Sequence, residues 1–292
     1  MTMATSMRRQ IRKTLSMLTI PWVYGSSRKE SNGGGMMKIL RSRLKAMRNR
    51  MGYIFSFHKH KKLRYGDTEI LVKVGSAWEY SRATGGFETY PLDCFFRLGI
   101  SPEQDVYYEI SSCNSIASLI MSKILTSDRI AVVSFEPEAS NVYSSWINMR
   151  LNSVRNMVIL PVALSNTSGV LPLHLGGRSI APGQGGHSIE KDYGVGTTLV
   201  PSLALDKAIE IFNLPRPTLV SIDVEGHEDA VLEGMSGLLS SKCVRCLVVE
   251  VWSSKANMSQ IEGLMAGYGY TLSDFKTVGD GGCCVSPRGN ND

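Results

Sequence analysis

Residues 105–138 read DVYYEISSCNSIASLIMSKILTSDRIAVVSFEPE and hold two apolar runs on either side of a segment with helical spacing. The runs at 105–110 and 130–135 are rich in Val, Ile, Tyr and Phe, which is typical of buried strands. Between them, apolar residues recur at the spacing of one helix face, at Ile116, Leu119, Ile120 and Ile124. A strand, a helix and a second strand in this order predict parallel strands covered by a helix.

The same alternation continues along the chain. Before residue 105, a strand is expected at 69–74 and a short helix at 91–98. Later strands are expected at 156–160, 217–222 and 246–251, with helices near 142–149, 205–212, 231–234 and 261–265. A hairpin begins at 169–175, and the Gly-rich loop at 176–196 is long enough for an active-site lid. This order predicts an α/β fold with a mostly parallel, doubly wound, Rossmann-like sheet and helices on both faces.

The charge of the chain is divided unevenly between its two ends. Residues 1–64 contain 16 Lys or Arg and a single acid, Glu30, whereas residues 65–292 contain 16 basic and 25 acidic residues. We therefore predict a basic, largely flexible N-terminal arm at 1–64, followed by one domain at 65–292 whose motifs lie at about 105–250. The acidic domain carries no strong nucleic-acid signal.

Within the arm, residues 37–47 have a basic amphipathic pattern, with Met37, Leu40, Leu44 and Met47 on one helix face. Such a helix suits a membrane surface, an acidic partner or an organelle address, and a solvated tail is the alternative. No run of about 18 uncharged apolar residues is present, so no membrane-spanning helix is expected. The compartment, cytoplasmic or organellar, stays open.

The composition is that of a globular protein. Of the 292 residues, 43% are hydrophobic and 20% are charged, which excludes a wholly disordered chain. The six cysteines do not form the dense ladder of a small secreted domain, so a reducing compartment is expected. Cys243 and Cys246 have zinc-like spacing, but on a strand their side chains would point to opposite faces.

Acidic residues stand at the ends of the expected strands. Glu109 and Glu136 close the first two, Asp223 and Glu225 follow the strand at 217–222, and Glu250 closes the strand at 246–251. Ligands of an open parallel sheet bind beyond the carboxyl ends of its strands. A carboxylate after the second strand can accept hydrogen bonds from both hydroxyls of a ribose, so Glu136 predicts a nucleoside cofactor.

Several stretches in this order match one known family. The most specific is Ser221-Ile-Asp-Val-Glu-Gly-His-Glu228 with Val231-Leu-Glu-Gly234. The weaker ones are Val133-Ser-Phe-Glu-Pro-Glu138, residues 148–152, Pro161-Val-Ala-Leu-Ser165 with Gly169, Leu205-Asp206, and Val248-Val-Glu250. With these motifs the chain resembles the FkbM family of S-adenosylmethionine-dependent methyltransferases. The resemblance implies a class I methyltransferase fold, S-adenosylmethionine as cofactor with Ser165 near its adenine, and methylation of a hydroxyl on a sugar, glycan or natural-product-like small molecule.

The cofactor loop departs from the family pattern Asp-x-Gly-Ala-Asn-x-Gly. Glu109 stands for the acid, Ser111 and Ser115 for the two glycines, and Cys113 for the Asn. Glycine permits positive φ and close approach to a ligand, so Ser111 is expected to crowd the cofactor pocket, while Ser115 can cap the next helix. A methyltransferase-fold protein that has lost its cofactor and serves as an interaction module is therefore the alternative. The absence of Gly-x-Gly-x-x-Gly after this strand argues against a nicotinamide or flavin enzyme.

Methyl transfer to a hydroxyl needs alignment of the reacting atoms and a group that takes the proton. Asp223 and His227 are the candidates for this base; a helix N-cap and an exposed first-turn position are their alternative roles. Asp223, Glu225 and Glu250 could also converge on a divalent ion such as Mg²⁺. In the Gly-rich loop, His187 and Ser188 are candidates for contact with the acceptor.

Overall fold

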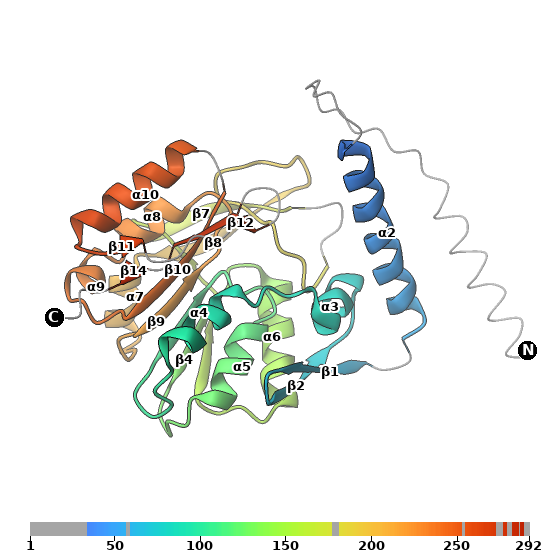
Figure 1. Ribbon diagram of the computed structural model, residues 1–292, viewed down its shortest axis with the longest axis horizontal. Coiled ribbons are helices and arrows are strands. Elements are labelled where there is room, and N and C mark those ends of the chain that lie inside the picture. Colours follow the sequence, from blue (N-terminus) through green and yellow to red (C-terminus); the bar gives the residue numbers. More distant parts are fainter. Residues whose placement is uncertain are drawn as a thin grey trace, which may run out of the picture. The chain divides into compact units, whose positions relative to one another are not determined.

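A computed structural model describes residues 34–56, 59–176, 181–252, 255–272, 277–278, 282–285 and 287–288. The chain divides into two compact units, Met1–Lys45 and Ala46–Asp292, and the second carries the sheet (Figure 1). Helix α2 (Gly34–Ile54) is longer than the helix expected at 37–47. Among the described residues, no helix has the length and apolar character that crossing a bilayer requires.

Seven strands form the central sheet in the order β12-β13-β10-β9-β3-β4-β5. The five parallel strands are β3 (Tyr107–Ile110), β4 (Val132–Phe135), β5 (Met157–Leu160), β9 (Leu219–Ile222) and β10 (Cys246–Trp252). The antiparallel ones are β12 (Thr277–Val278) and β13 (Gly282–Val285). Because β3 lies between β4 and β9, the strand order reverses there, and the doubly wound, mostly parallel sheet is confirmed.

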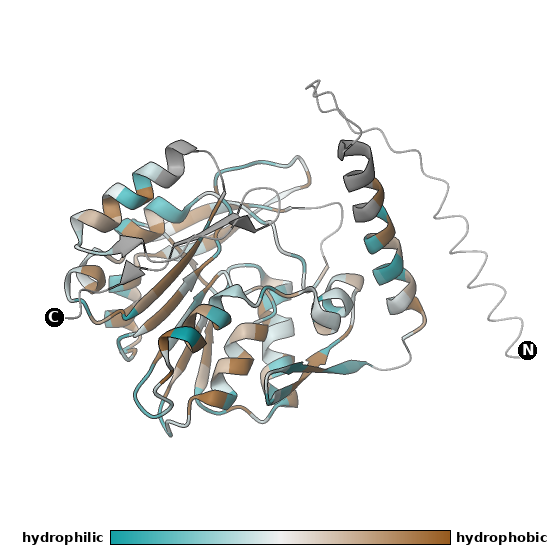
Figure 2. Cartoon of the chain, viewed as in Figure 1, coloured by the Kyte–Doolittle hydropathy of each residue, from teal (hydrophilic) through white to brown (hydrophobic). Residues whose placement is uncertain are grey.

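Helices cover both faces of this sheet. One face carries α4 (Tyr90–Leu98), α5 (Ile116–Ile124) and α6 (Ala139–Leu151), and the other carries α7 (Leu205–Ile211), α8 (Glu228–Glu233), α9 (Ser236–Ser240) and α10 (Lys255–Gly267) (Figure 1). Successive strand residues enter different cores, since Tyr107 packs with α4 and α5 whereas Tyr108 packs with α7 to α10. The five parallel strands are accordingly mostly apolar (Figure 2), although Glu109, Ser134, Ser221 and Glu250 lie within them.

A hairpin precedes the sheet, made of β1 (His60–Tyr65) and β2 (Thr68–Lys73). Only its second strand was expected, and β1 begins inside the segment assigned to the basic arm, whose boundary at residue 64 stays a prediction. The edge of β2 that β1 leaves free is hydrogen-bonded by α6. Asn148 accepts from Lys73 N at 2.7 Å, and Asn152 accepts from Leu71 N at 2.8 Å and donates to Leu71 O at 2.7 Å. Side-chain amides therefore dock this hairpin onto the domain.

A second, three-stranded sheet lies after β5. It consists of β6 (Ala163–Leu164), β7 (Gly169–His174) and β8 (Thr197–Leu203), in the order β6-β8-β7. The hairpin expected at 169–175 is thus completed by β8, and the Gly-rich loop connects its two strands. At the C-terminal end, β11 (Thr271–Leu272) pairs with β14 (Pro287–Arg288).

Two short elements that the sequence did not predict follow β2. They are α3 (Ala77–Ser81) and a π-helical turn, η1 (Arg82–Gly86). Buried Glu79 anchors them, because it accepts hydrogen bonds from Gly75 N and Lys73 Nζ and from the hydroxyl of Ser144. This segment carries Arg82 and Glu88 toward the carboxyl ends of the strands.

Candidate functional site

A pocket opens at the carboxyl ends of β3, β4, β9 and β10. The strand register explains which residues meet there, because Ile110 pairs with Phe135 on one side and with Ile222 on the other. The next residues, Ser111, Glu136 and Asp223, therefore leave the sheet at one level, and all three line the pocket. This is the reversal point at which open α/β sheets bind ligands.

Glu136 is 3% exposed, and its carboxylate is held at the pocket wall by the backbone. One oxygen accepts from Cys113 N at 2.6 Å and the other from Glu138 N at 2.9 Å. Burial nevertheless raises the pKa of Glu136 to about 8. Each carboxylate oxygen can accept a further hydrogen bond, so the residue can serve a pair of hydroxyl groups on a ligand.

The cofactor loop adopts the backbone that glycines would favour. Ser111, Cys113 and Ser115 have φ of 66°, 51° and 56°, in the left-handed region. A side chain there costs roughly 1–2 kcal/mol for each residue. The positive φ expected at the two glycine positions of the family pattern is therefore adopted by Ser111 and Ser115. Ser111 and Cys113 line the pocket, as predicted for the cofactor loop.

Ser115 has a different place from the one expected. It precedes α5, but its side chain makes no helix cap and is not among the described residues that line the pocket. Its hydroxyl instead lies within 2.7, 2.8 and 3.1 Å of the hydroxyls of Ser134, Ser145 and Ser112. This buried hydroxyl cluster supports the loop from beneath and leaves the pocket unobstructed by Ser115.

Glu109 and Asn114 complete the inner wall. Glu109 accepts hydrogen bonds from Ser118 N and Ser118 Oγ, and burial raises its pKa to about 7. Asn114 is 1% exposed, and its amide Nδ2 finds no hydrogen-bond partner among the described residues. A buried, unpaired donor is costly, so Nδ2 is available to an acceptor atom of a bound molecule. No sequence pattern pointed to this role of Asn114.

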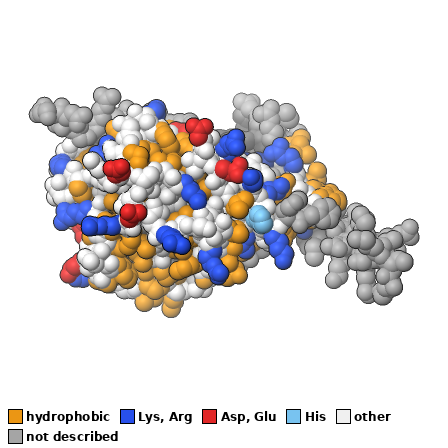
Figure 3. Space-filling view, turned by 90° about the horizontal axis from the view of Figure 1, so that it is seen from below, with side chains coloured by type: hydrophobic (Ala, Val, Ile, Leu, Met, Phe, Trp, Pro, Cys, Tyr) orange, Lys and Arg blue, Asp and Glu red, His pale blue; other side chains and the backbone are white. Residues whose placement is uncertain are grey.

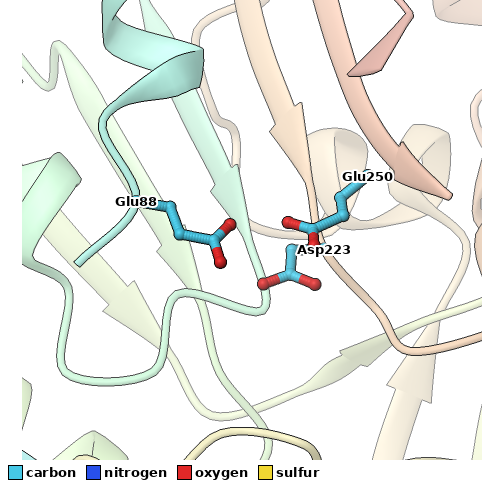
Figure 4. A group of neighbouring side chains, drawn as sticks. All are labelled: Glu88, Asp223 and Glu250. Atoms are coloured by element: carbon cyan, nitrogen blue, oxygen red, sulfur yellow. The ribbon is translucent and has the colours of Figure 1, made fainter. Parts of the chain in front are cut away.

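Three carboxylates converge at the mouth of the pocket, from Glu88, Asp223 and Glu250 (Figure 4). Oxygen atoms of all three lie within 4.8 Å of one another. The protein around them removes part of their hydration, and they repel each other, so the pKa of Asp223 is raised to about 7 and that of Glu250 to about 10. Such a set of oxygens could hold a divalent ion.

The composition of this cluster differs from the expected one. Glu225 also lines the pocket, and burial raises its pKa to about 7, but Glu88 takes its place in the group. Arg82 brings a positive charge to the same pocket, and its Nε donates to Gly183 O at 2.9 Å. Neither Glu88 nor Arg82 could be assigned from the sequence, because both come from the unpredicted segment after β2.

His227 and Ser165 lie next to each other but are not among the described residues that line the pocket. His227 Nε2 is 2.9 Å from Ser165 Oγ, and His227 Nδ1 is 2.7 Å from an oxygen of Glu190. Both ring nitrogens are thus engaged, which leaves the imidazole without a free nitrogen to act as a base on a ligand. Glu190 had no signal in the sequence.

The Gly-rich loop contributes one of its two predicted residues to the pocket. His187 lines it, accepts from Gly176 N at 3.0 Å, and has a pKa lowered by burial. Ser188 is 1% exposed and turns away, donating its hydroxyl to Glu225 O at 2.9 Å. The described part of the loop contacts the rest of the domain. Its Pro182 O accepts a hydrogen bond from Ser76 Oγ at 2.5 Å.

Two of the sequence markers have packing roles. Gly234 lies against the carbonyl of Ser165, which leaves no space for a side chain. Asp206 accepts hydrogen bonds from Gly237 N and Leu238 N at 2.7 and 2.9 Å and so caps α9. These residues explain part of the motif without contact with a ligand.

Comparison with known proteins agrees with this geometry. A family model described as the methyltransferase FkbM domain matches residues 114–272. The hexuronic acid methyltransferase AglP of Haloferax volcanii is 27% identical over 152 residues, which are 51% of this chain and 56% of that protein.

Two solved structures are similar at low identity. They are the methyltransferase FkbM of Methylobacillus flagellatus (TM-score 0.48, 13% identity, 86% of this chain and 60% of that one) and a SAM-dependent methyltransferase of Agrobacterium tumefaciens (TM-score 0.45, 10% identity, 80% and 71%). The family model covers more than half of the chain, and the matched residues include β4, β5, β9 and β10 with Glu136, Asp223 and Glu250. The chain belongs to the FkbM family of S-adenosylmethionine-dependent methyltransferases.

Proposed function

We propose that this protein transfers the methyl group of S-adenosylmethionine to a hydroxyl oxygen of a sugar-like acceptor. The observation that carries the proposal is that Glu136 and Asp223 follow strand residues that pair with the same residue of β3. Both acids therefore lie at the rim of one pocket. In this proposal, Glu136 binds the nucleoside and Asp223 faces the acceptor. The name of the relative AglP supports a sugar acid as the acceptor class.

The pocket residues fit the cofactor. Glu136 retains acceptor capacity for two ribose hydroxyls, and the unpaired Nδ2 of Asn114 offers a donor to a carboxylate or a ring nitrogen. Ser111 and Cys113 form the loop against which such a ligand would lie. When bound, S-adenosylmethionine supplies a methyl group on a positively charged sulfur, and the surrounding carboxylates favour that charge.

Asp223 is the residue we assign to proton removal. Its carboxylate is open to the pocket, and a pKa raised to about 7 allows it to accept a proton near neutral pH. As the acceptor oxygen forms its bond to the methyl carbon and the carbon–sulfur bond breaks, the hydroxyl proton passes to Asp223. Alignment of the reacting atoms supplies the rest of the rate enhancement.

Calorimetric titration with S-adenosylhomocysteine tests the cofactor site. We expect saturable binding to the natural chain and a loss of at least tenfold in affinity for Glu136→Ala. Glu210→Ala is the matched control, because Glu210 is an exposed carboxylate on α7 paired only with Lys207 among the described contacts. Absence of binding to the natural chain at millimolar ligand would reject the enzyme and favour the interaction module.

The acceptor class is tested by formation of S-adenosylhomocysteine from S-adenosylmethionine. D-Glucuronate and D-galacturonate are offered beside D-glucose and D-galactose at equal concentration. We expect turnover with the uronates, and Arg82, as the cation in the pocket, gives a reason for a preference over the neutral sugars. Equal rates with all four sugars, or with none, would contradict a sugar-acid acceptor.

We further propose that α2 rests on an anionic lipid surface. Residues 34–54 contain six Lys or Arg and no acid. Four apolar side chains spaced for one helix face are 43–54% exposed: Leu40, Leu44, Met47 and Met51. Apolar side chains beside cations suit the boundary of an anionic bilayer. On the face drawn in Figure 3, by contrast, Lys and Arg are scattered among other side chains, with no continuous stripe for nucleic acid.

Vesicle flotation tests the role of α2. The full chain should float with phosphatidylcholine vesicles that contain phosphatidylserine and remain behind with phosphatidylcholine alone. Met47→Glu with Met51→Glu should abolish flotation, whereas Val170→Glu, at a 63% exposed position on β7, should not. Equal flotation of the α2 variant, or preferential binding of the chain to RNA in competition, would overturn the lipid proposal.

A further inference from the structure

Residues 187–190 alternate between the pocket and the body of the domain. His187 and Ile189 line the pocket. Ser188 and Glu190 point away from the pocket. Ser188 Oγ donates to Glu225 O at 2.9 Å, and a carboxylate oxygen of Glu190 lies 2.7 Å from His227 Nδ1. One side of this short segment therefore forms a pocket wall, and the other side holds that wall in place.

The attachment continues inward from His227. Its Nε2 lies 2.9 Å from Ser165 Oγ, and Ser165 N donates to Leu203 O at 3.0 Å. His227 is 7% exposed and Ser165 is 2% exposed, so both are held by the packed interior. Glu190, His227 and Ser165 form a continuous chain of hydrogen bonds from the loop to the three-stranded sheet.

The order of these groups is that of a serine hydrolase triad, but the surroundings exclude that chemistry. A nucleophilic serine must be reachable by a substrate beside donors for the developing oxyanion. Ser165 is buried and is not among the described residues that line the pocket. The contacts therefore act on structure.

We infer that the chain of Glu190, His227 and Ser165 is a clamp that holds the acceptor-side wall of the pocket against the segment that carries Asp223. The clamp joins Ile189 and His187 to residues 223–225, which line the pocket from β9. Its purpose rests on the proposed function, because this wall is where an acceptor would lie. Glu190 and His227 are positioning residues, and Asp223 alone is assigned to proton transfer.

Glycines in the described part of the loop explain why an attachment such as this clamp is needed. Gly183 and Gly186 adopt φ of 81° and 76°, and Gly185 lies between them. Glycines lose the most conformational freedom when they are ordered. A hydrogen bond between an imidazole and a carboxylate is stronger than one between neutral groups, although exposure of 57% of the Glu190 side chain weakens it.

Hydrogen–deuterium exchange of the full chain tests the clamp without any ligand. Glu190→Ala should speed exchange of the amides at 182–191 by about five- to tenfold. Glu190→Gln, which keeps an oxygen acceptor for His227 Nδ1, should restore most of the protection. Glu210→Ala should leave the exchange of this loop unchanged, since it removes a carboxylate of similar exposure elsewhere.

The outcome is separable from that of the proposed function. Unchanged exchange in Glu190→Ala, or equal acceleration in Glu190→Ala and Glu190→Gln, would overturn the clamp whether or not S-adenosylhomocysteine binds. Conversely, if the natural chain fails to bind S-adenosylhomocysteine but loop protection follows the expected order, the clamp stands and the catalytic proposal falls.

Discussion

At the scale of single residues, the chemistry of this site depends on the pKa values of its carboxylates, which rise when the protein removes part of their hydration. Glu136 and Asp223 are ordinary acids in the sequence, yet burial raises the pKa of Glu136 to about 8, and partial loss of hydration together with the nearby carboxylate of Glu88 raises the pKa of Asp223, whose side chain stays exposed, to about 7. Values near neutrality suit proton exchange with a substrate. A bound sulfonium would favour the ionised forms and so partly reverse these shifts.

Replacing Asp223 by Asn should lower kcat by about 10²- to 10⁴-fold, because the amide cannot take the hydroxyl proton. S-Adenosylhomocysteine affinity should change little. In the natural enzyme, kcat/KM, which reports the ligand-free protein, should fall as the pH decreases below about 7, where Asp223 becomes protonated. A rate that is independent of pH between 5.5 and 8, or an active Asp223→Asn variant, would contradict this assignment.

At the scale of elements, two serines of the cofactor loop adopt the positive φ that glycine favours, and their side chains have different surroundings. Ser111 and Ser115 have nearly the same positive φ, but Ser111 faces the pocket while Ser115 joins a buried cluster of hydroxyls. The backbone strain is the same at both positions. The hydroxyl of Ser115 makes hydrogen bonds that offset this strain, and none is described for the hydroxyl of Ser111.

The two glycine substitutions should therefore change stability in opposite directions. Ser111→Gly relieves the strain and should raise the free energy of unfolding by about 1 kcal/mol. Ser115→Gly relieves similar strain but removes the buried hydroxyl that contacts Ser134 and Ser145, each of which keeps one other hydrogen bond, and should lower it by about 1 kcal/mol. Denaturant unfolding of the two variants measures both values, and shifts of equal sign would refute this account of the loop.

At the scale of the whole molecule, an ion pair between buried Asp105 and exposed Arg245 joins segments at the opposite end of the strands. Asp105 is 2% exposed, and its two oxygens lie 3.1 and 2.6 Å from Arg245 Nε and a terminal nitrogen of the same guanidinium. Thr218 Oγ1 and Ser101 N also donate to it, each at 2.7 Å. The segments that precede β3, β9 and β10 meet at this one carboxylate.

Removing Asp105 should therefore destabilise the domain as a whole. Asp105→Ala removes the acceptor of Thr218 Oγ1 and Ser101 N and the partner of Arg245, whose side chain is 39% exposed, and should cost about 1–2 kcal/mol of unfolding free energy. Asp105→Asn, which keeps hydrogen-bond acceptors, should cost less. Calorimetric unfolding measures the loss, and a variant as stable as the natural chain would show that the pair contributes nothing to the fold.

The pocket carboxylates also predict how stability depends on pH. Glu109, Glu136, Asp223 and Glu225 have folded pKa values of about 7 to 8, above those of the unfolded chain near 4. Between about pH 4 and pH 8 the folded state binds more protons than the unfolded state, so the stability that these groups contribute is fully present below about pH 4 and is lost as the pH rises toward 8. Melting temperatures measured across this range should fall, and a flat or rising profile would contradict the raised pKa values.

Much of this protein could be predicted from local patterns. Alternating strand and helix periods predicted the sheet, because burial on both faces makes each parallel strand mostly apolar. The carboxyl ends of parallel strands meet at one edge, so Glu136 and Asp223 could be placed together before any coordinates. The loop serines could be singled out because positive φ is a property of the local backbone.

Other features depended on contacts between distant segments. Glu88 and Arg82 reach the pocket on a turn that packs through buried Glu79, and Glu190 meets His227 across 37 positions of sequence. The hydroxyl of Ser115 also turns from the expected cap to a cluster with Ser134 and Ser145. Periodicity and residue type thus determined the fold, the strand-end acids and the family, since these depend on short-range order. Which charges meet, and which side chain faces the pocket, was decided only by tertiary packing, because partners far apart in sequence leave no local pattern.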